Sequence, residues 1–219
     1  MTHPRVAAII PAYNEEATVG EVVEAVRSSP LIDEVIVISD GSHDQTKAMA
    51  EAAGAIVHLL PKNQGKGAAM LHGITHTDAP VVIFFDADIL GLTPDHIERI
   101  LLPVLSGSRV MNVGLRDRGF LNGLVPHLPL VGGERALMRH VIEGIPPKFV
   151  GGFMVESAMN YYCRSRGYPY GGVFLQSLKI RHKYEKVGWF LGVVQYIRMW
   201  IQVGWSMIWV RFARLFKQF

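Results

Sequence analysis

The chain has 219 residues, of which 49% are hydrophobic and 19% charged, and its formal net charge is +3 at pH 7. This composition excludes a low-complexity chain, and the length predicts one domain with a substantial core plus a tail. Cys163 is the single cysteine, which excludes an intrachain disulfide and favours a reducing, cytoplasmic compartment. The N-terminal residues have the pattern of a first strand and not that of a signal peptide.

Strand and helix patterns alternate through the N-terminal half. Apolar runs predict strands at residues 5–10, 34–39, 55–60 and 81–86. Helical patterns follow each of them, beginning near residues 15, 44, 66 and 94. The last of these helices is opened by Thr93 and Pro94, a capping residue and a residue suited to the first turn. The alternation predicts an α/β fold, with a Rossmann-like, mostly parallel sheet flanked by helices on both faces.

Four polar residues follow the predicted strands or lie in the loops after them: Asn14, Asp40, Lys66 and Asp86. Right-handed crossovers bring the carboxyl ends of parallel strands to one edge of a sheet. These four residues are therefore expected to converge, although they are far apart in sequence. In an open α/β sheet, that edge is where ligands bind.

Two carboxylates, Asp86 and Asp88, end the apolar run VVIFF at residues 81–85. Carboxylate oxygens suit a hard cation such as Mg²⁺ or Mn²⁺, which is commonly shared with phosphates. Lys66 stands between two glycines, which lets it approach a phosphate closely. The alternatives are that the aspartates cap a turn and that Lys66 is an ordinary exposed lysine.

Four motifs occur in an order and spacing that resemble glycosyltransferase family 2, which has the GT-A fold: PAYNEE (11–16), ISDGSHDQT (38–46), NQGKGAAMLHG (63–73) and FFDADIL (84–90). The resemblance covers about the first 95 residues and implies binding of a nucleotide-diphosphate sugar. It divides the chain into a GT-A domain over residues 1–186 and a tail over 187–219. Within the domain, residues 1–95 would bind the nucleotide sugar and residues 96–186 the acceptor.

The resemblance also implies roles for individual residues. Pro11, Tyr13 and Glu15 would border the base and ribose, and Asp40 would accept a hydrogen bond from the base. Many relatives have Asp-Asp-Gly-Ser where this chain has Ser39-Asp40-Gly41-Ser42, which leaves open the position that contacts the base.

At the reacting end of the donor, the resemblance places Lys66 near the diphosphate. Asp88 would ligate the metal and act in catalysis, and Asp86 would lie on the ribose or the metal.

On the acceptor side, the candidate residues are Arg116, Asp117, Arg118, Gly132, Gly133, Glu134, Arg135 and Glu156. Residues 150–162 resemble a segment of glucosyl-3-phosphoglycerate synthases that carries an acceptor-side glutamate, which makes Glu156 a candidate catalytic residue together with Arg135. Residues 179–188 resemble the segment in which those enzymes place a metal-binding histidine. His182 is therefore a candidate third metal ligand, and a surface histidine is the alternative.

The tail concentrates positive and aromatic residues. Residues 179–219 carry eight Lys or Arg residues against one acid, Glu185, and all four tryptophans lie there. At helical spacing, five aromatic residues would form one stripe with cations opposite, the pattern of an amphipathic helix on an anionic membrane surface. The alternative is packing against the domain or against a second subunit in a homodimer. No nucleic-acid-binding motif accompanies the charge.

The sequence thus predicts a metal-dependent glycosyltransferase, cytoplasmic and peripheral to the inner face of the membrane. It would transfer a sugar to a phosphorylated small molecule or to a polyprenyl phosphate, because an anionic acceptor needs no strong general base. Two alternatives are a sugar-1-phosphate nucleotidyltransferase, whose opening glycine-rich loop is not matched, and a non-catalytic nucleotide-sugar-binding module at membranes.

Overall fold

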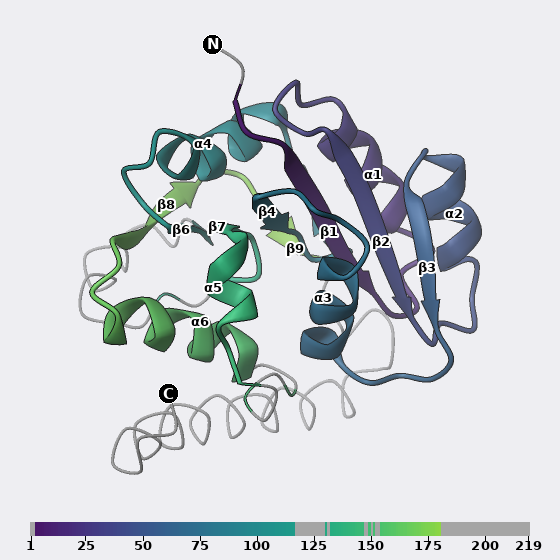
Figure 1. The fold of residues 1–219 in the computed structure, drawn as a ribbon. Coiled ribbons are helices and arrows are strands. Elements are labelled where there is room, and N and C mark those ends of the chain that lie inside the picture. The colour runs from purple at the N-terminus through teal and green to yellow at the C-terminus, as the bar shows by residue number, and fades with distance from the viewer. Residues whose placement is uncertain are drawn as a thin grey trace, which may run out of the picture.

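A seven-stranded sheet in the order β3-β2-β1-β4-β7-β6-β8 runs through the computed structural model (Figure 1). The structure describes residues 3–116, 130, 132–146, 149, 151 and 154–180. The strands of the sheet are β1 (Val6–Ala12), β2 (Glu34–Asp40), β3 (Ile56–Leu60), β4 (Val81–Phe84), β6 (Met111–Arg116), β7 (Arg135–Met138) and β8 (Tyr170–Leu175). Two short strands, β5 (Ile89–Leu90) and β9 (Lys179–Ile180), pair antiparallel apart from it.

The pairing is mostly parallel, as predicted. Strand β1 pairs in parallel with β2 and β4, β2 with β3, and β6 with β8. Only β7, among the described strands of this sheet, runs against its neighbours β4 and β6. The start of β7 therefore lies at the same edge as the ends of β4 and β6.

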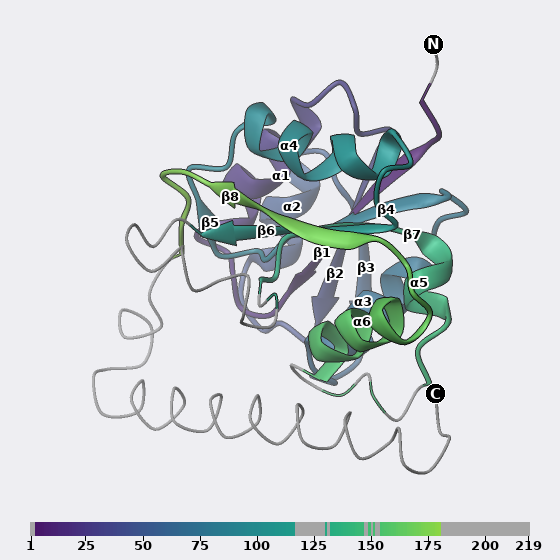
Figure 2. The same cartoon turned by 90° about the vertical axis from the view of Figure 1, so that its left-hand side faces the viewer.

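Helices cover both faces of the sheet. Figure 2 shows α1 (Val19–Arg27), α2 (Thr46–Ala52) and α4 (Pro94–Leu105) on one face, and α3 (Lys66–Ile74), α5 (Arg139–Glu143) and α6 (Met154–Ser165) on the other. Alternate residues of β1 face opposite layers: Ala7 and Ile9 pack in the core beneath α3, α5 and α6, whereas Val6 and Ala8 pack beneath α1 and α4. This arrangement explains why β1 is an almost continuous apolar run.

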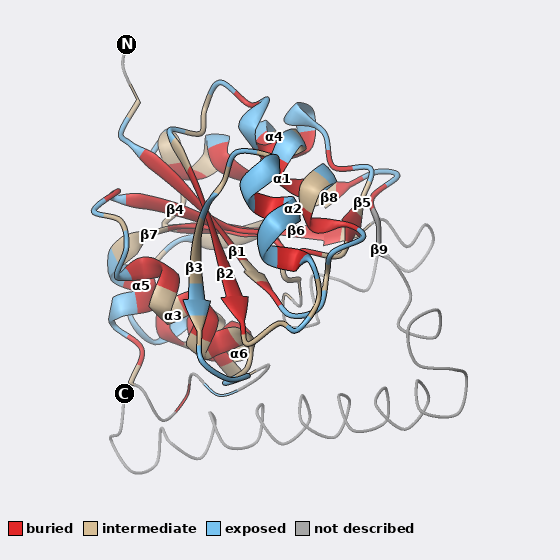
Figure 3. Ribbon diagram, turned by 90° about the vertical axis from the view of Figure 1, so that its right-hand side faces the viewer, coloured by how far each residue is buried: buried red, intermediate tan, exposed pale blue. Residues whose placement is uncertain are grey.

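Burial is greatest in the central strands and falls at the β3 edge (Figure 3). All four residues of β4 are fully buried, whereas Ile56 and Leu59 of β3 are 53% and 54% exposed. On α4, the hydroxyl of Thr93 accepts a hydrogen bond from the backbone N–H of His96, and the His96 side chain accepts one from the N–H of Thr93. The predicted cap at this helix is confirmed.

The boundaries differ from the sequence expectations by a few residues. Helix α2 begins at Thr46, against an expected start near residue 44, and α1 begins at Val19, against an expected start near residue 15. Strand β4 ends at Phe84, two residues before Asp86, which lies in the following loop. In the part of the chain that the structure describes, no helix is both long enough and apolar enough to cross a membrane. The tail predicted over residues 187–219 lies outside the described residues.

Candidate active site

An ion-pair cluster joins the first residue of α3, the loop after β4 and the first turn of α6. The Lys66 Nζ atom lies 2.6 Å from Asp86 Oδ1 and 2.8 Å from Glu156 Oε1. All three side chains are largely buried yet keep some exposure, from 10% for Glu156 to 27% for Asp86. The sheet topology brings Lys66 and Asp86 to one edge, as the sequence predicts, and α6 adds Glu156 from the acceptor half.

Arg135, at the start of β7, lies beneath this cluster and is fully buried. Its guanidinium donates to the carbonyl of Gly132 at 2.6 and 3.2 Å and to the carbonyl of Glu156 at 3.3 Å. Its Nη2 atom is also 3.7 Å from Glu156 Oε2. Arg135 is thus placed to hold Glu156 and is fully covered by protein atoms, so positioning is the role that its burial favours.

A second ion pair adjoins the first. Arg116, the last residue of β6, donates to Glu134 Oε1 at 3.1 Å, and Glu134 is almost completely buried. The Arg116 side chain keeps 28% of its surface exposed. Because β6 and β4 end at the same edge, this pair lies beside Asp86.

The charges of the cluster shift the pKa values of its members. Burial alone would lower the pKa of Lys66, but the charges of Asp86 and Glu156 outweigh it and raise that pKa. Burial acts to raise the pKa of Asp86, and the charges of Lys66, Arg116 and Arg135 overcome it and lower that pKa. Burial and the nearby Asp86 charge together raise the pKa of Glu134. Lys66 and Asp86 are therefore both held in their charged forms.

Two glycines let the backbone pass close to this edge. A Cβ atom at Gly133 would lie 2.6 Å from the Asp86 carboxyl carbon, and one at Gly132 would collide with the carbonyl of Gly114. Neither position can accept a side chain without displacing its neighbour. The pair Gly132-Gly133 therefore fixes how closely β7 approaches the Asp86 carboxylate.

Asp40, at the end of β2, is almost fully buried. Its two carboxylate oxygens accept hydrogen bonds from the backbone N–H groups of Gln64 and Gly65, at 2.7 and 2.8 Å. Gly65 has a φ of 90°, which a glycine adopts without strain. Asp40 thus holds the turn that leads into Lys66, a function that the sequence analysis missed because its partners are backbone groups. Its predicted contact with the base stays a prediction.

The loops after β1 and β2 are bonded to one another. The N–H of Asn14 donates to Ser42 Oγ at 3.1 Å, and the N–H of Glu15 donates to Thr46 Oγ1 at 2.8 Å. Tyr13 is 44% exposed in the same loop. The first two motifs therefore meet as expected. Thr46, which the sequence analysis did not single out, is identifiable afterwards as the first residue of α2, two residues after Asp44.

Asp86 and Asp88 both lie in the turn between β4 and β5, and Asp88 is half-buried. Two carboxylates fit a hard divalent cation that takes its other ligands from phosphates and water. Among the described residues, no group of three or more His, Cys, Asp or Glu side chains is placed to hold a metal ion. The predicted third ligand, His182, lies outside those residues, as do Asp117 and Arg118.

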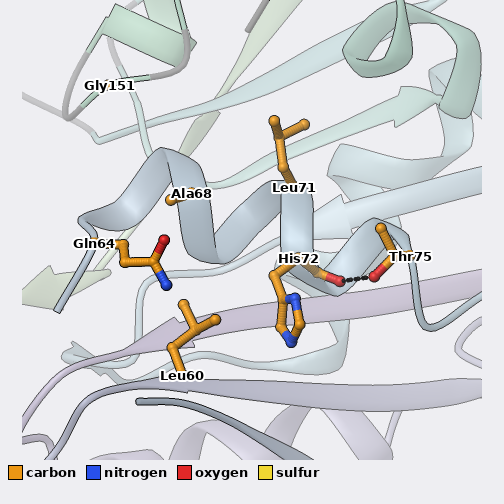
Figure 4. A pocket seen from close by; sticks show the side chains of 7 residues that line it. All are labelled: Leu60, Gln64, Ala68, Leu71, His72, Thr75 and Gly151. Carbon is orange, nitrogen blue, oxygen red and sulfur yellow. Dashed lines mark hydrogen bonds between the residues drawn. The ribbon is translucent and has the colours of Figure 1, made fainter. Parts of the chain in front are cut away.

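A separate cavity of about 510 Å³ lies along α3 (Figure 4). It is lined by Leu60, Gln64, Ala68, Leu71, His72, Thr75 and Gly151. None of these residues belongs to the two ion-pair networks described above. The cavity is therefore distinct from the charged cluster, although Gln64 is two residues from Lys66.

Comparison with known proteins gives consistent matches. The family model described as glycosyl transferase family 2 matches residues 7–159. Glucosyl-3-phosphoglycerate synthase of Mycolicibacterium smegmatis is 32% identical over 187 residues, which cover 69% of this chain and 61% of that protein. A 4,4'-diaponeurosporenoate glycosyltransferase of Staphylococcus aureus is 34% identical over 104 residues, covering 45% of this chain and 28% of that protein.

Solved structures of similar shape include two complexes of Mycobacterium tuberculosis glucosyl-3-phosphoglycerate synthase. The complex with Mn²⁺, uridine diphosphate and phosphoglyceric acid has a TM-score of 0.70 and 27% identity, and covers 81% of this chain and 71% of that one. The complex with Mg²⁺ and uridine diphosphate has a TM-score of 0.70 and 26% identity, with coverage of 81% and 72%. The chain spans 61% of the length of the first curated synthase that it matches. The predicted GT-A-type architecture is confirmed.

Proposed function

This chain belongs to glycosyltransferase family 2, and from that premise we propose that it transfers a sugar from a nucleoside-diphosphate sugar to a phosphorylated acceptor. The observation that carries the proposal is the meeting of Lys66, Asp86 and Glu156 at the carboxyl edge of the sheet. Ligands of open α/β sheets bind at that edge. Uridine is the proposed nucleoside of the donor, since the solved synthases that resemble this chain bind uridine diphosphate.

The chemistry that the cluster can perform follows from its charges. The diphosphate leaves with negative charge, and a buried ammonium such as that of Lys66 stabilises charge that develops beside it. Asp86 and Asp88 would hold the Mg²⁺ or Mn²⁺ ion, which supplies Lewis-acid stabilisation of the diphosphate when bound. Pro11, Tyr13, Glu15 and Asp40 are proposed to line the base and ribose.

On the acceptor side, Glu156 is the proposed contact and Arg135 holds it in place. Arg116, partly exposed beside the cluster, is proposed to attract the phosphate of the acceptor. Its Nε atom is buried and has no hydrogen-bond partner among the described residues. Phosphoglycerate is the first acceptor to test, because it is the one bound by the similar synthase. A polyprenyl phosphate is the second, since it presents the same anionic group.

A non-catalytic nucleotide-sugar-binding module is the remaining alternative class. Such a module would bind the nucleotide sugar as an enzyme does but would not transfer the sugar to an acceptor. A sugar-1-phosphate nucleotidyltransferase is disfavoured by the family to which the chain belongs.

The test is a panel of nucleotide sugars, each with Mn²⁺, screened by thermal shift and then assayed for transfer to 3-phosphoglycerate and to a polyprenyl phosphate by mass spectrometry. A native-state ligand raises the melting temperature. Asp88→Ala should abolish transfer and cation-dependent nucleotide binding, whereas Asp95→Ala, an exposed aspartate on α4, should leave both unchanged. Equal nucleotide affinity with and without Mn²⁺, or donor binding without any turnover, would overturn the proposal.

Membrane association is a separate proposal that rests on the sequence of the tail alone. Each Lys or Arg near an anionic bilayer contributes roughly 1 kcal/mol, which salt weakens, and the aromatic residues would supply a salt-resistant part. Removal of residues 189–219 should release the protein from anionic liposomes while donor binding is kept. A wild-type dimer that dissociates on the same truncation and never sediments with liposomes would identify the tail as a subunit interface.

A further inference from the structure

Three histidine rings meet at the C-terminal end of α3, the opposite end from Lys66. His72 lies in the last turn of α3, His76 follows two residues after the helix, and His58 comes from the neighbouring strand β3. The His58 and His76 rings are stacked, with centroids 3.5 Å apart and planes 10° apart. The rings of His72 and His76 meet edge to face at 4.6 Å.

The ring nitrogens of His72 and His76 face one another. Their Nε2 atoms are 3.1 Å apart. Two imidazole nitrogens that bind one metal ion at about 2.0–2.1 Å, in neighbouring positions of a square or tetrahedral site, are separated by roughly 2.8–3.4 Å. The observed separation, which is also that of a hydrogen bond between the two rings, falls in that range, and both rings would turn away from the line that joins the two atoms to direct their lone pairs at one ion.

The backbone around this pair is ordered by the helix. The N–H of Thr75 donates to the carbonyl of His72, and the N–H of His76 donates to the carbonyl of Gly73, both at 3.1 Å. These bonds continue the helical turn past Ile74 and keep His72 and His76 on one side, as residues four apart on a helix are. His76 is exposed and His72 half-buried, so an ion can reach the pair from solvent.

The surroundings favour the form of histidine that binds metals. Partial desolvation of the otherwise exposed His76 ring, with smaller effects from His58 and His72, lowers the pKa of His76. A lowered pKa keeps the imidazole neutral at neutral pH, and neutral imidazole is the ligating form. The stacked ring of His58 also limits the orientations open to His76.

We propose that His72 and His76 form a two-ligand surface site for a borderline divalent transition metal such as Zn²⁺, Ni²⁺ or Cu²⁺. Water would complete the coordination, since no third His, Cys, Asp or Glu converges with them in the described part of the chain. Imidazole nitrogen selects these ions over Mg²⁺, Ca²⁺ and Mn²⁺, which prefer oxygen. The site therefore differs in chemistry from the carboxylate pair Asp86 and Asp88.

The experiment is calorimetric titration of the untagged protein with Ni²⁺ in excess Mg²⁺, which occupies the carboxylate pair and leaves the histidines free. His72→Ala and His76→Ala are each expected to weaken Ni²⁺ binding by about 100-fold, because either change leaves a single ligand in place of a chelate. His43→Ala is the matched control: it removes one exposed histidine outside the cluster and should leave the Ni²⁺ affinity unchanged. His58→Ala should have a small effect, since both ligands remain.

Thermal unfolding gives a second measurement that does not depend on activity. Ni²⁺ should raise the melting temperature of the wild type and of His43→Ala, and should not raise that of His72→Ala or His76→Ala. Circular dichroism establishes that each variant is folded. Unchanged Ni²⁺ affinity in His72→Ala and His76→Ala would overturn the proposal. So would loss of Ni²⁺ binding in a variant that lacks only Asp86 and Asp88, because the ion would then occupy the carboxylate pair.

Discussion

Lys66 and Glu156 are separated by 90 positions in the chain, yet the Lys66 Nζ atom is 2.8 Å from Glu156 Oε1. This ion pair links the proposed donor half of the domain to its acceptor half. The same ammonium also contacts Asp86, so one lysine is shared by the two sides of the site. A change in any of the three residues is therefore expected to affect both nucleotide binding and the position of Glu156.

Asp86→Asn should lower the free energy of unfolding in a pH-dependent way. The pKa of Asp86 is lowered in the folded protein, so its stabilising contribution is present above its unfolded pKa of about 3.9 and is lost as the pH falls toward the folded value. We expect a loss of roughly 1–3 kcal/mol at pH 6, typical of a hydrogen bond to a charged group. The difference in unfolding free energy between Asp86→Asn and the wild type should narrow as the pH approaches 3.5.

Urea unfolding of both proteins in EDTA, at pH values between 6 and 3.5, measures this gap. The pKa of Glu134 is raised, so its contribution has the opposite sign: it is present at low pH and lost as the pH rises. The Asp86 charge helps to raise the pKa of Glu134, so this contribution differs between the two proteins, and the comparison is therefore made in a Glu134→Gln background that removes it. A gap that stays constant or widens on acidification would contradict the assigned charge state of Asp86.

Gly133→Ala should displace the Asp86 carboxylate, because Gly133 passes close to it. The new methyl group would lie 2.6 Å from the Asp86 carboxyl carbon and would push that carboxylate away from Lys66. We expect a loss of roughly 1–3 kcal/mol of stability, as for other overpacked positions, together with weaker cation-dependent nucleotide binding. Gly20→Ala is the control: its methyl group would have no neighbour closer than 3.8 Å and it lies in α1, so stability should be unchanged or slightly higher. Equal effects of the two changes would refute the close-approach interpretation.

Arg135→Lys tests whether Arg135 acts through Glu156. A lysine keeps the charge but lacks the planar fork of N–H donors with which Arg135 bonds the carbonyls of Gly132 and Glu156. We expect a stability loss of roughly 1–3 kcal/mol and slower turnover, with little change in KM for the donor. In a double-mutant cycle with Glu156→Gln, the effects on kcat should be smaller than additive, because both changes act on the same carboxylate. Fully additive effects would show that Arg135 does not position Glu156.

The fold of the N-terminal half was predictable because each element has its own local pattern. Strands β1, β2 and β4 are buried on both faces and appear as apolar runs, and α4 begins with a threonine cap. The second half was less predictable. Strand β7 has only four residues, begins with a buried arginine and pairs antiparallel with two strands, none of which a local pattern indicates.

The candidate site divides in the same way. Asp86 and Lys66 were predictable from their positions after strands, since topology alone brings them together. The contacts of Arg135 and Asp40 were not, because they are hydrogen bonds to backbone groups, and any residue in those loops could provide them. Burial of the charged Glu134 and Arg135 side chains is likewise visible only in three dimensions, where Arg116 and Glu156 neutralise them.

Asp40→Asn separates two roles of one carboxylate. An amide has a single accepting oxygen, so one of the N–H groups of Gln64 and Gly65 would lose its partner and face the amide nitrogen. We expect a stability loss of roughly 1–3 kcal/mol and weaker binding of every nucleotide, because the turn before Lys66 loosens. If Asp40 also contacts the base, discrimination among nucleotides should fall as well.

Affinities for a panel of nucleoside diphosphates distinguish these outcomes. Asp33→Asn is the matched control, since Asp33 also accepts a hydrogen bond from a backbone N–H, that of Val6 at 2.7 Å. Asp33 directly precedes β2 and therefore lies at the amino ends of the parallel strands, away from the candidate site. It should reduce stability without changing nucleotide affinity. Uniform weakening across the panel in Asp40→Asn would restrict Asp40 to holding the turn, whereas a changed ranking would assign it to the base. Identical affinities and ranking in Asp40→Asn and wild type would exclude both roles, because a turn that tolerates the lost bond cannot depend on it.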